Sequence, residues 1–206
     1  PKDVSTRLIE AFIRCKKLCE HLHLPLQAGS DKVLRLMNRG YSVDKYLGLV
    51  QEVRRAVPGI AITTDLIVGF PGETEDDFQA TLEAVRRARF DSAFTFIYSP
   101  REGTPAASMK PAVPEEIKRD RVHRLIDEQN RISLEKNQEL VGKSVEVMIE
   151  GQSPKSEGML TGRTRTNKVV VFPMLLQWKP GDLVNLRITQ ARTWTLEGKC
   201  ENGSKA

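Results

Sequence analysis

The sequence predicts a two-part protein, an α/β segment followed by a small antiparallel β-barrel. Through about residue 100, short runs rich in Val, Ile and Thr alternate with amphipathic stretches, as expected for parallel strands joined by helices. After Gly142, apolar residues recur at every second position, beginning with Val145, Val147 and Ile149, as expected for half-buried strands. These two periodicities divide the chain near residue 140.

The first part contains signals for three strand and helix units. Ser30, Ser42 and Thr74 stand where helix caps are expected, and Gly40 and Pro58 stand where two of the helices should stop. The expected strands are 20–27, 60–70 and 93–98, and the expected helices are 31–38, 43–57, 74–89 and 114–140. Three such units are too few to close a parallel barrel, so we expect a partial one with open sheet edges.

The last part is punctuated by Gly and Pro into five short strands. We expect them at 145–150, 158–166, 168–172, 182–189 and 192–199. Five strands in some 60 residues are typical of a small closed barrel. The predicted domains are therefore 1–140, a partial barrel with a long connector helix, 141–203, the small β-barrel, and a tail at 204–206.

Composition sets limits on function. The 206 residues carry a formal charge of +5, and residues 141–206 hold 10 Lys and Arg against 6 Asp and Glu, which favours an anionic partner for the last part. The nearly apolar run at 169–176 is too short to cross a bilayer, and the N-terminus does not resemble a targeting peptide. Three cysteines are too few for a disulfide framework. We expect a cytoplasmic protein with reduced thiols and no membrane partner.

Three polar or glycine-rich segments follow the predicted strands, at 23–31, 65–74 and 98–105. Ligands of parallel α/β folds bind at the carboxyl ends of strands, so these segments are candidates for a binding site. Gln27 offers an amide donor and an acceptor, and Asp65 offers a carboxylate that could accept hydrogen bonds from ribose hydroxyls. Taken singly, each segment also fits an ordinary strand-to-helix turn with a cap.

Four motifs stand in a specific order, namely HLPLQAGSD, MNRGY, DLIVGFPGETEDDF and YSPREGTPAA. Together they resemble the second half of the radical S-adenosylmethionine (SAM) barrel, and within it the methylthiotransferases. The stretch EGQSPKSEGMLTGRTRTNKVVVF is similar to the TRAM domain of the same enzymes, particularly those that act on isopentenyl-adenosine in tRNA. The resemblance covers almost the whole chain and implies the C-terminal half of a radical SAM (βα) barrel followed by an OB-like TRAM barrel.

The resemblance implies a set of cofactor-binding residues. Gln27 and Asp65 would hold the ribose of SAM, and Arg39 would meet its carboxylate with a charge-assisted bond. Gly69 and Tyr98 would border the adenine. Arg39 could instead be a helix C-terminal charge and Asp65 a loop acceptor. We expect Arg101 and Glu102 to form a loop ion pair near the mouth of the site.

The cluster chemistry of the family has no ligands in this sequence. Radical cleavage of SAM requires a [4Fe-4S] cluster on a CxxxCxxC motif, and the family carries a second [4Fe-4S] cluster on its N-terminal domain. Cys15 and Cys19 form only CxxxC, followed by His21 and His23, and we interpret them as structural thiols. We therefore assign no metal site and no catalytic residue, and expect the chain alone to be inactive.

The C-terminal barrel carries a candidate RNA-binding cluster. Arg163, Arg165 and Lys168 lie within six residues, Lys155 extends the set, and no acidic residue occurs between positions 158 and 181. Strand alternation would place Arg163 and Arg165 on one face, where they suit phosphate contacts. The alternative is a solvated basic face. Trp178 and Trp194 could be base-stacking platforms, but tryptophans of small barrels more often lie in the core, so we expect both in the core and assign neither to the site.

The predicted parent function is addition of a 2-methylthio group to isopentenyl-adenosine beside the anticodon, with two SAM molecules in different roles. Its partners would be the tRNA anticodon stem-loop and a reductant such as flavodoxin or ferredoxin. Relatives that use threonylcarbamoyl-adenosine or a ribosomal-protein aspartate remain alternatives. A non-catalytic RNA-binding module is a further alternative of another class.

Overall fold

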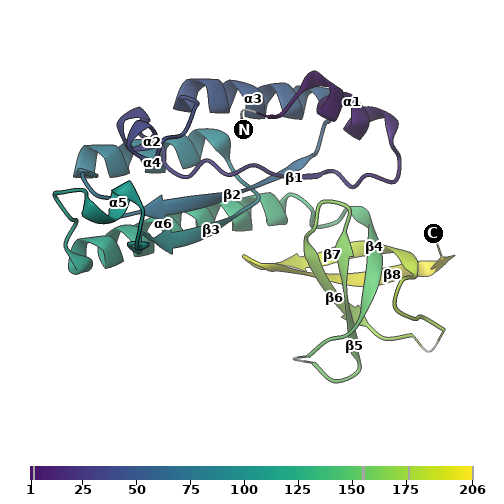
Figure 1. The fold of residues 1–206 in the computed structure, drawn as a ribbon. Helices are drawn as coiled ribbons and strands as arrows, with labels where there is room; N and C mark the ends of the chain where they lie inside the picture. Colours follow the sequence, from purple (N-terminus) through teal and green to yellow (C-terminus); the bar gives the residue numbers. More distant parts are fainter. Residues whose placement is uncertain (2, 155, 176, 206) are drawn as a thin grey trace. The chain divides into compact units, whose positions relative to one another are not determined.

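The computed structural model describes residues 1, 3–154, 156–175 and 177–205, with side chains as far as residue 200 (Figure 1). The chain forms two compact units. The first comprises Pro1–Leu18 and Leu22–Ile132, and the second comprises Cys19–His21 and Ser133–Ala206. In the described part of the chain, no helix is both long enough and apolar enough to span a bilayer.

A three-stranded sheet forms the centre of the first unit. Its order is β1 (His21–His23), β2 (Ala61–Val68) and β3 (Ser92–Ile97). β2 and β3 are parallel, with Thr63 opposite Ser92 and Val68 opposite Ile97. The three expected strands are therefore present; β1 and β2 are shorter than their sequence signals, and β3 is shifted by one residue.

Side chains alternate across this sheet. Ile62, Leu66 and Val68 are buried with apolar side chains of the helices in one core. Asp65 and Ile67 lie opposite Phe94 and Phe96 on the other face, where both phenylalanines are exposed. Because successive residues of a strand point to opposite faces, one face of the sheet is covered by helices and the other carries polar and aromatic groups.

Six helices accompany the described strands, and four of them were expected. They are α1 (Thr6–Arg14), α2 (Asp31–Leu36), α3 (Val43–Ala56), α4 (Glu75–Ala88), α5 (Pro105–Ser108) and α6 (Glu115–Gln138). Ser30, Ser42 and Thr74 cap α2, α3 and α4 as predicted. α1, capped by Ser5, and the single turn of α5 were not predicted.

The end of α2 differs from the prediction. Asn38, not Gly40, takes the left-handed conformation, with φ of 56°. The Asn38 N–H donates to Arg35 O, and the Arg39 N–H donates to Leu34 O at 2.8 Å. These two hydrogen bonds satisfy the last carbonyls of the helix. Glycine suits the left-handed position best, and asparagine is the next most suitable residue.

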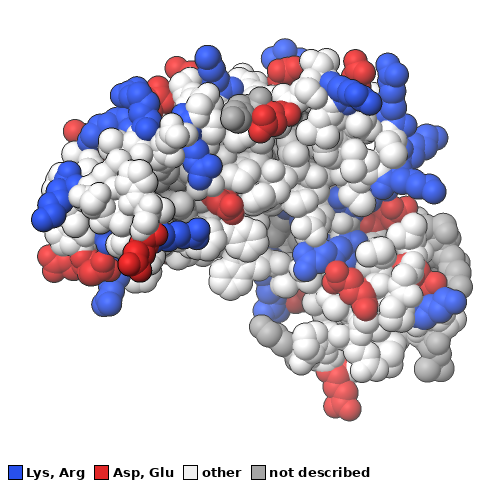
Figure 2. Space-filling model, in the orientation of Figure 1, with Lys and Arg blue, Asp and Glu red and all other residues white. Residues whose placement is uncertain are grey.

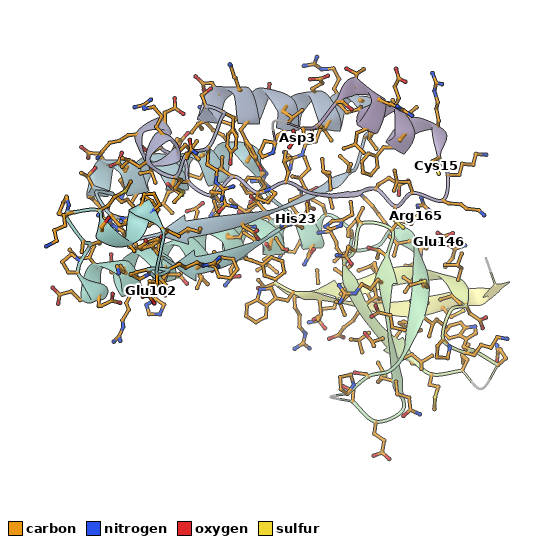
Figure 3. All side chains as sticks on the ribbon, in the orientation of Figure 1. Asp3, Cys15, His23, Glu102, Glu146 and Arg165 are labelled. Carbon is orange, nitrogen blue, oxygen red and sulfur yellow. The ribbon has the colours of Figure 1, made fainter. Side chains whose placement is uncertain are left out.

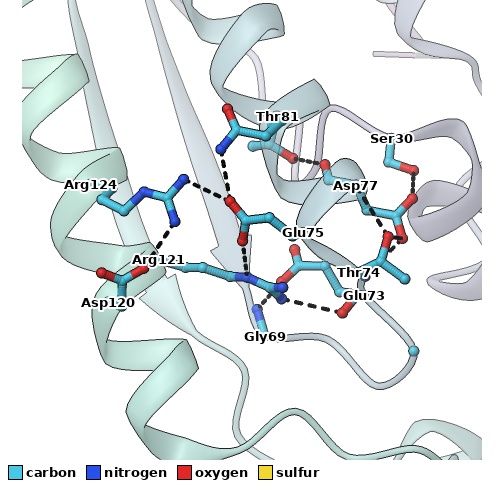
Figure 4. A network of polar contacts seen from close by, with 12 residues as sticks. Ser30, Gly69, Glu73, Thr74, Glu75, Asp77, Thr81, Asp120, Arg121 and Arg124 are labelled. Carbon is cyan, nitrogen blue, oxygen red and sulfur yellow. Dashed lines mark hydrogen bonds and ion pairs between the residues drawn. The ribbon is translucent and has the colours of Figure 1, made fainter.

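Asp77 connects the starts of α2 and α4. Its carboxylate accepts hydrogen bonds from Ser30 Oγ at 2.7 Å, Lys32 Nζ at 2.7 Å, and the Thr74 N–H and Oγ1 at 2.9 and 2.8 Å (Figure 4). Burial alone would raise the pKa of Asp77, but the bonds from Lys32, Ser30 and Thr74 outweigh it and hold the pKa well below its usual range. The turns after β1 and β2 are thereby fixed to each other.

The second unit contains the predicted closed barrel of five strands, and their order is β4-β5-β6-β8-β7. The strands are β4 (Ser144–Gln152), β5 (Met159–Thr164), β6 (Val169–Pro173), β7 (Leu183–Ala191) and β8 (Thr195–Lys205). β6 and β8 pair in parallel, so the barrel is not wholly antiparallel. An odd number of strands cannot alternate in direction around a closed ring, so at least one parallel pair is required.

The barrel core confirms one tryptophan prediction and corrects the other. Trp178 is buried, and its ring meets Phe172 edge-on at a centroid distance of 5.7 Å. Trp194 is 73% exposed, so its predicted place in the core is wrong. The two units divide between Ile132 and Ser133, inside α6, and β8 continues to Lys205, where a tail was predicted.

We predict that Asp77→Asn lowers the unfolding free energy at pH 7 by about 1–3 kcal/mol, because four donors lose a charged acceptor. The pKa of Asp77 is depressed in the folded state, so this stabilisation is present above the unfolded value of 3.8 and is lost as the pH falls below it. Urea unfolding of both proteins between pH 7 and pH 3 measures the gap.

The matched control is Asp76→Asn, which removes an exposed carboxylate from the same helix turn. It should cost less than about 0.5 kcal/mol. A gap for Asp77→Asn that stays constant with pH, or that matches the control, would contradict the assigned role.

Candidate functional site

A cavity of about 890 Å³ opens at the carboxyl ends of β2 and β3. Gln27, Arg39, Asp65 and Tyr98, four of the five residues predicted to bind the cofactor, line it. Its other lining residues are Leu36, Met37, Asn38, Ile67, Phe70, Phe96, Ile97, Ser99, Arg101, Thr104, Pro105, Ala106 and Met109. The wall is therefore largely apolar, with a few polar groups directed at one space, as in typical small-molecule sites.

Gln27 is held in the wall by backbone pairing to β2. Its N–H donates to Asp65 O at 2.9 Å, and its carbonyl accepts from the Ile67 N–H at 2.8 Å. Its φ is 73°, a left-handed conformation that is unfavourable for a residue with a β-carbon. Gln27 is 7% exposed and lies in the lining of the cavity, where its side-chain amide offers donors and an acceptor to a ligand.

The turn continues through Gly29, where the chain touches α4. The Gly29 N–H donates to Thr81 Oγ1 at 2.9 Å, and a β-carbon at Gly29 would lie 2.4 Å from Thr81 Cα. Only glycine allows this approach. The position of Gln27 in the cavity wall thus depends on a glycine two residues later.

Asp65 lies beside His23, a contact the sequence did not predict. His23 Nε2 is 3.4 Å from Asp65 Oδ2, and His23 Nδ1 is 3.0 Å from Thr63 Oγ1. Thr63 and Asp65 are two residues apart on β2 and point to the same face. This alternation is the part of the contact that the sequence could have indicated. His23 thus orients one carboxylate oxygen of Asp65 at the edge of the cavity.

Tyr98 carries an unsatisfied polar atom in the wall. Its backbone N–H donates to Val68 O at 2.8 Å, and its ring meets Phe70 edge-on at a centroid distance of 4.9 Å. The hydroxyl is buried, with no hydrogen-bond partner in the described structure. A buried hydroxyl without a partner is unfavourable, and a ligand that bonds to it would remove this cost.

Arg39 and Arg101 add positive charge to the cavity. Burial raises the pKa of Tyr41, and the nearby positive charge of Arg39 opposes this rise. The Tyr41 hydroxyl donates to Leu26 O at 2.9 Å and so fixes this segment to the turn that carries Gln27. The predicted ion pair between Arg101 and Glu102 is not formed among the described residues, and Glu102, which Figure 3 labels, is not part of the cavity lining.

Gly69 lies outside the cavity wall, although we predicted that it borders the adenine. Its N–H donates to Glu73 Oε2 at 2.7 Å, and Arg121 Nη1 of α6 donates to the same oxygen at 2.8 Å (Figure 4). Burial raises the pKa of Glu73, against the opposing effects of the Gly69 N–H and Arg121. A β-carbon at Gly69 would lie 2.4 Å from Lys118 Cγ. Gly69 therefore allows the loop between β2 and α4 to pack closely against α6.

The described residues hold no group of three or more His, Cys, Asp or Glu side chains arranged for a metal. Cys15 (labelled in Figure 3) and Cys19, which we interpreted as structural thiols, are both free and exposed. α1 ends at Cys15, and Cys19 lies beyond the helix.

The predicted RNA-binding cluster has acidic neighbours that the sequence did not reveal. Arg163 Nε donates to Glu150 Oε1 at 3.1 Å, and Arg165 Nε donates to Glu20 Oε2 at 2.7 Å. Hydrogen bonding to Glu20 raises the pKa of Arg165 above its usual range. Positive and negative side chains are accordingly interspersed on the visible surface (Figure 2). The sequence between positions 158 and 181 has no acidic residue, but the fold brings acidic side chains from other segments next to its arginines.

The geometry of the cluster also differs from the prediction. Arg165 lies near Glu146 (Figure 3). Because β5 ends at Thr164, Arg165 lies in the following turn and does not share a strand face with Arg163. Lys168 Nζ donates to Asn137 Oδ1 of α6 at 2.9 Å. Lys155 lies outside the described residues.

Two family models match the chain. Residues 3–85 match the Radical SAM superfamily, and residues 138–200 match the TRAM domain. Coproporphyrinogen III oxidase (HemN) from Escherichia coli, described as a radical SAM enzyme, aligns with a TM-score of 0.54 and 21% identity over 76% of this chain and 34% of its own. That similarity supports the fold.

The resemblance to the methylthiotransferases is confirmed by relatives that share the same name. tRNA-2-methylthio-N(6)-dimethylallyladenosine synthase of Moorella thermoacetica is 53% identical over 203 residues, which are 98% of this chain and 46% of the relative. The protein of that name from Acetivibrio thermocellus is 54% identical over 96% of this chain and 41% of the relative. The chain spans less than half the length of these relatives.

We predict that Tyr98→Phe leaves the unfolding free energy of the ligand-free protein unchanged or raises it by up to about 1 kcal/mol, because it removes a buried hydroxyl without a partner. Tyr46→Phe is the matched control. The buried Tyr46 hydroxyl donates to Leu24 O at 2.6 Å, so its removal should cost about 1 kcal/mol. Chemical unfolding measures both, and equal destabilisation of the two variants would show that the Tyr98 hydroxyl has a partner.

Proposed function

We propose that this chain supplies the SAM-binding cavity and the RNA-binding domain of an enzyme that adds a 2-methylthio group to dimethylallyl (isopentenyl) adenosine in tRNA. The observation that carries the proposal is the convergence of Gln27, Asp65, Arg39 and Tyr98 on one cavity. The shared name of the relatives supports this substrate over threonylcarbamoyl-adenosine or a ribosomal-protein aspartate.

The polar groups of the cavity match the parts of SAM. The Asp65 carboxylate would accept hydrogen bonds from the ribose hydroxyls, with its other oxygen oriented by His23. The Gln27 amide would add a further bond to the ribose. Arg39 would bind the carboxylate of the methionine moiety through a charge-assisted bond, and the Tyr98 hydroxyl would gain a partner at the adenine. The volume of about 890 Å³ is within the range of cofactor sites.

SAM would supply the radical and the methyl group of the reaction, with two [4Fe-4S] clusters in the whole enzyme and electrons from a flavodoxin or ferredoxin. The residues of this chain would bind and orient SAM and exclude water from it. Cluster ligands would come from elsewhere, because the sequence has no CxxxCxxC motif. The chain by itself should therefore bind SAM without cleaving it.

The second unit would bind the anticodon stem-loop of tRNA. The TRAM match and the cations Arg163, Arg165 and Lys168 support this role. Because Arg163 and Arg165 already contact carboxylates, RNA phosphates would have to replace Glu150 and Glu20 as their partners. A sequence with only three cysteines, together with a tRNA partner, favours the cytoplasm.

We predict that Asp65→Asn and Gln27→Ala each weaken SAM binding by about tenfold to a hundredfold, because each removes a hydrogen bond in a partly buried site. RNA affinity should not change. Ligand-observed NMR titration is suitable because it measures both micromolar and millimolar dissociation constants.

The controls for SAM binding are Asp44→Asn and Gln51→Ala, which make the same chemical changes at exposed positions of α3. They should bind SAM as the wild type does. Unchanged affinity in both site variants, with wild-type unfolding curves, would exclude this cavity as the SAM site.

We predict that the double variant Arg163→Gln and Lys168→Gln weakens tRNA binding and flattens its salt dependence by up to about 2 units of slope, because two fewer counterions are released. Lys45→Gln with Arg55→Gln removes two exposed charges from α3 and is the control. Dissociation constants over a range of salt decide. Parallel salt plots for the wild type and both double variants would mean that the cluster does not contact phosphates.

A further inference from the structure

Trp194 is the most exposed large hydrophobic side chain in the described structure, at 73%. It lies between β7 and β8, at the edge of the barrel, whereas Trp178 is buried in the core. Tryptophan is enriched at interfaces, because its large apolar ring can pack on a partner while its N–H donates a hydrogen bond, so this exposed side chain is a candidate contact. Neither the cavity nor the basic cluster accounts for it.

The segment that carries Trp194 is held in place by hydrogen bonds on both sides. Asn137 Nδ2 of α6 donates to Arg192 O at 2.8 Å and to Thr193 O at 3.0 Å. The Arg192 N–H donates to Thr195 O at 2.8 Å. The backbone that carries the indole is thus fixed before any partner binds, which lowers the entropy cost of an interaction.

The register of the barrel places Trp194 next to the basic cluster. β6 and β8 are parallel, and Val169 lies opposite Thr195, so the preceding residues, Lys168 and Trp194, stand at the same end of the two strands. Asn137 joins them, because its Oδ1 accepts from Lys168 Nζ and its Nδ2 binds the carbonyl of Thr193. Arg163 is near the same turn, with Nη1 3.2 Å from Asn167 Oδ1.

We propose that Trp194 is a stacking platform for an unpaired nucleobase of RNA, beside the phosphate contacts of Lys168 and Arg163. The proposal rests on the proposed RNA-binding function and specifies how the barrel selects single-stranded over paired RNA. An aromatic face stacks on any base, and an adjacent cation neutralises the phosphate that accompanies it. The neighbours Lys168, Arg192 and Thr193 are polar, which suits a nucleotide better than an apolar protein surface.

The chain has two tryptophans, and only Trp194 is exposed, so fluorescence can separate them. The chain is titrated with an RNA hairpin of anticodon stem-loop size and with a fully paired duplex of equal length. We expect the hairpin to quench the emission of Trp194 in a saturable way. The duplex should bind through phosphates but leave the emission nearly unchanged.

Substitutions separate stacking from charge. Trp194→Ala should weaken hairpin binding by about tenfold to a hundredfold without changing the slope of the salt plot, because a stacking contact releases no counterion. Trp194→Phe keeps an aromatic face and should bind within a few fold of the wild type. Met174→Ala, which truncates another exposed apolar side chain of the same barrel, is the control and should have no effect.

The outcomes distinguish this inference from the function on which it rests. Salt-dependent RNA binding with unchanged Trp194 emission, and wild-type affinity of Trp194→Ala, would overturn the stacking platform and leave RNA binding intact. Equal quenching by hairpin and duplex would also overturn it. No RNA binding by the wild-type chain would overturn the RNA-binding function and this inference together.

Discussion

The candidate site depends on the backbone pairing of Gln27 with β2. The bonds from the Gln27 N–H to Asp65 O and from the Ile67 N–H to Gln27 O hold Gln27 at φ of 73°, where the free backbone would rarely be found. The same two bonds place the Gln27 and Asp65 side chains on one cavity. The strain is balanced by the surrounding packing, including the close contact of Gly29 with α4, and such strain is common where a binding site must be preformed.

Each unit must hold its binding groups in fixed positions, and the two units do so in different ways. In the first, charged groups after the strand ends fix the loops, with Asp77 joining the starts of α2 and α4, and Glu73 with Arg121 joining the β2–α4 loop to α6. In the second, closure of five strands removes exposed sheet edges, and Asn137 fixes the turn that presents Trp194. In each unit a rigid scaffold presents a few polar or aromatic groups, which limits the entropy lost on binding.

Helix caps and strands, which depend on neighbouring residues, were predictable from the sequence. Contacts between residues far apart in the sequence were not. Caps such as Ser30 and Thr74, and the strands read from apolar periodicity, need only nearby residues. Motif resemblance brought Gln27, Arg39, Asp65 and Tyr98 to one site because it carries information from the folded family. The acidic partners of Arg163 and Arg165, the His23 contact with Asp65, and the exposure of Trp194 depend on strand register and closure. The end of α2 at Asn38 also depends only on neighbouring residues. It was placed at Gly40 because glycine is the stronger signal for a helix end.

The central claim is that the cavity beside Gln27 and Asp65 binds SAM. The most direct measurement is a titration of the isotope-labelled chain with SAM, followed by NMR of the Gln27 side-chain amide and the Tyr98 ring. The account predicts saturable shifts of both signals with one dissociation constant, while signals of the barrel residues 144–200 stay in place. Saturable binding that leaves Gln27 and Tyr98 unshifted, or no binding at millimolar SAM, would contradict it.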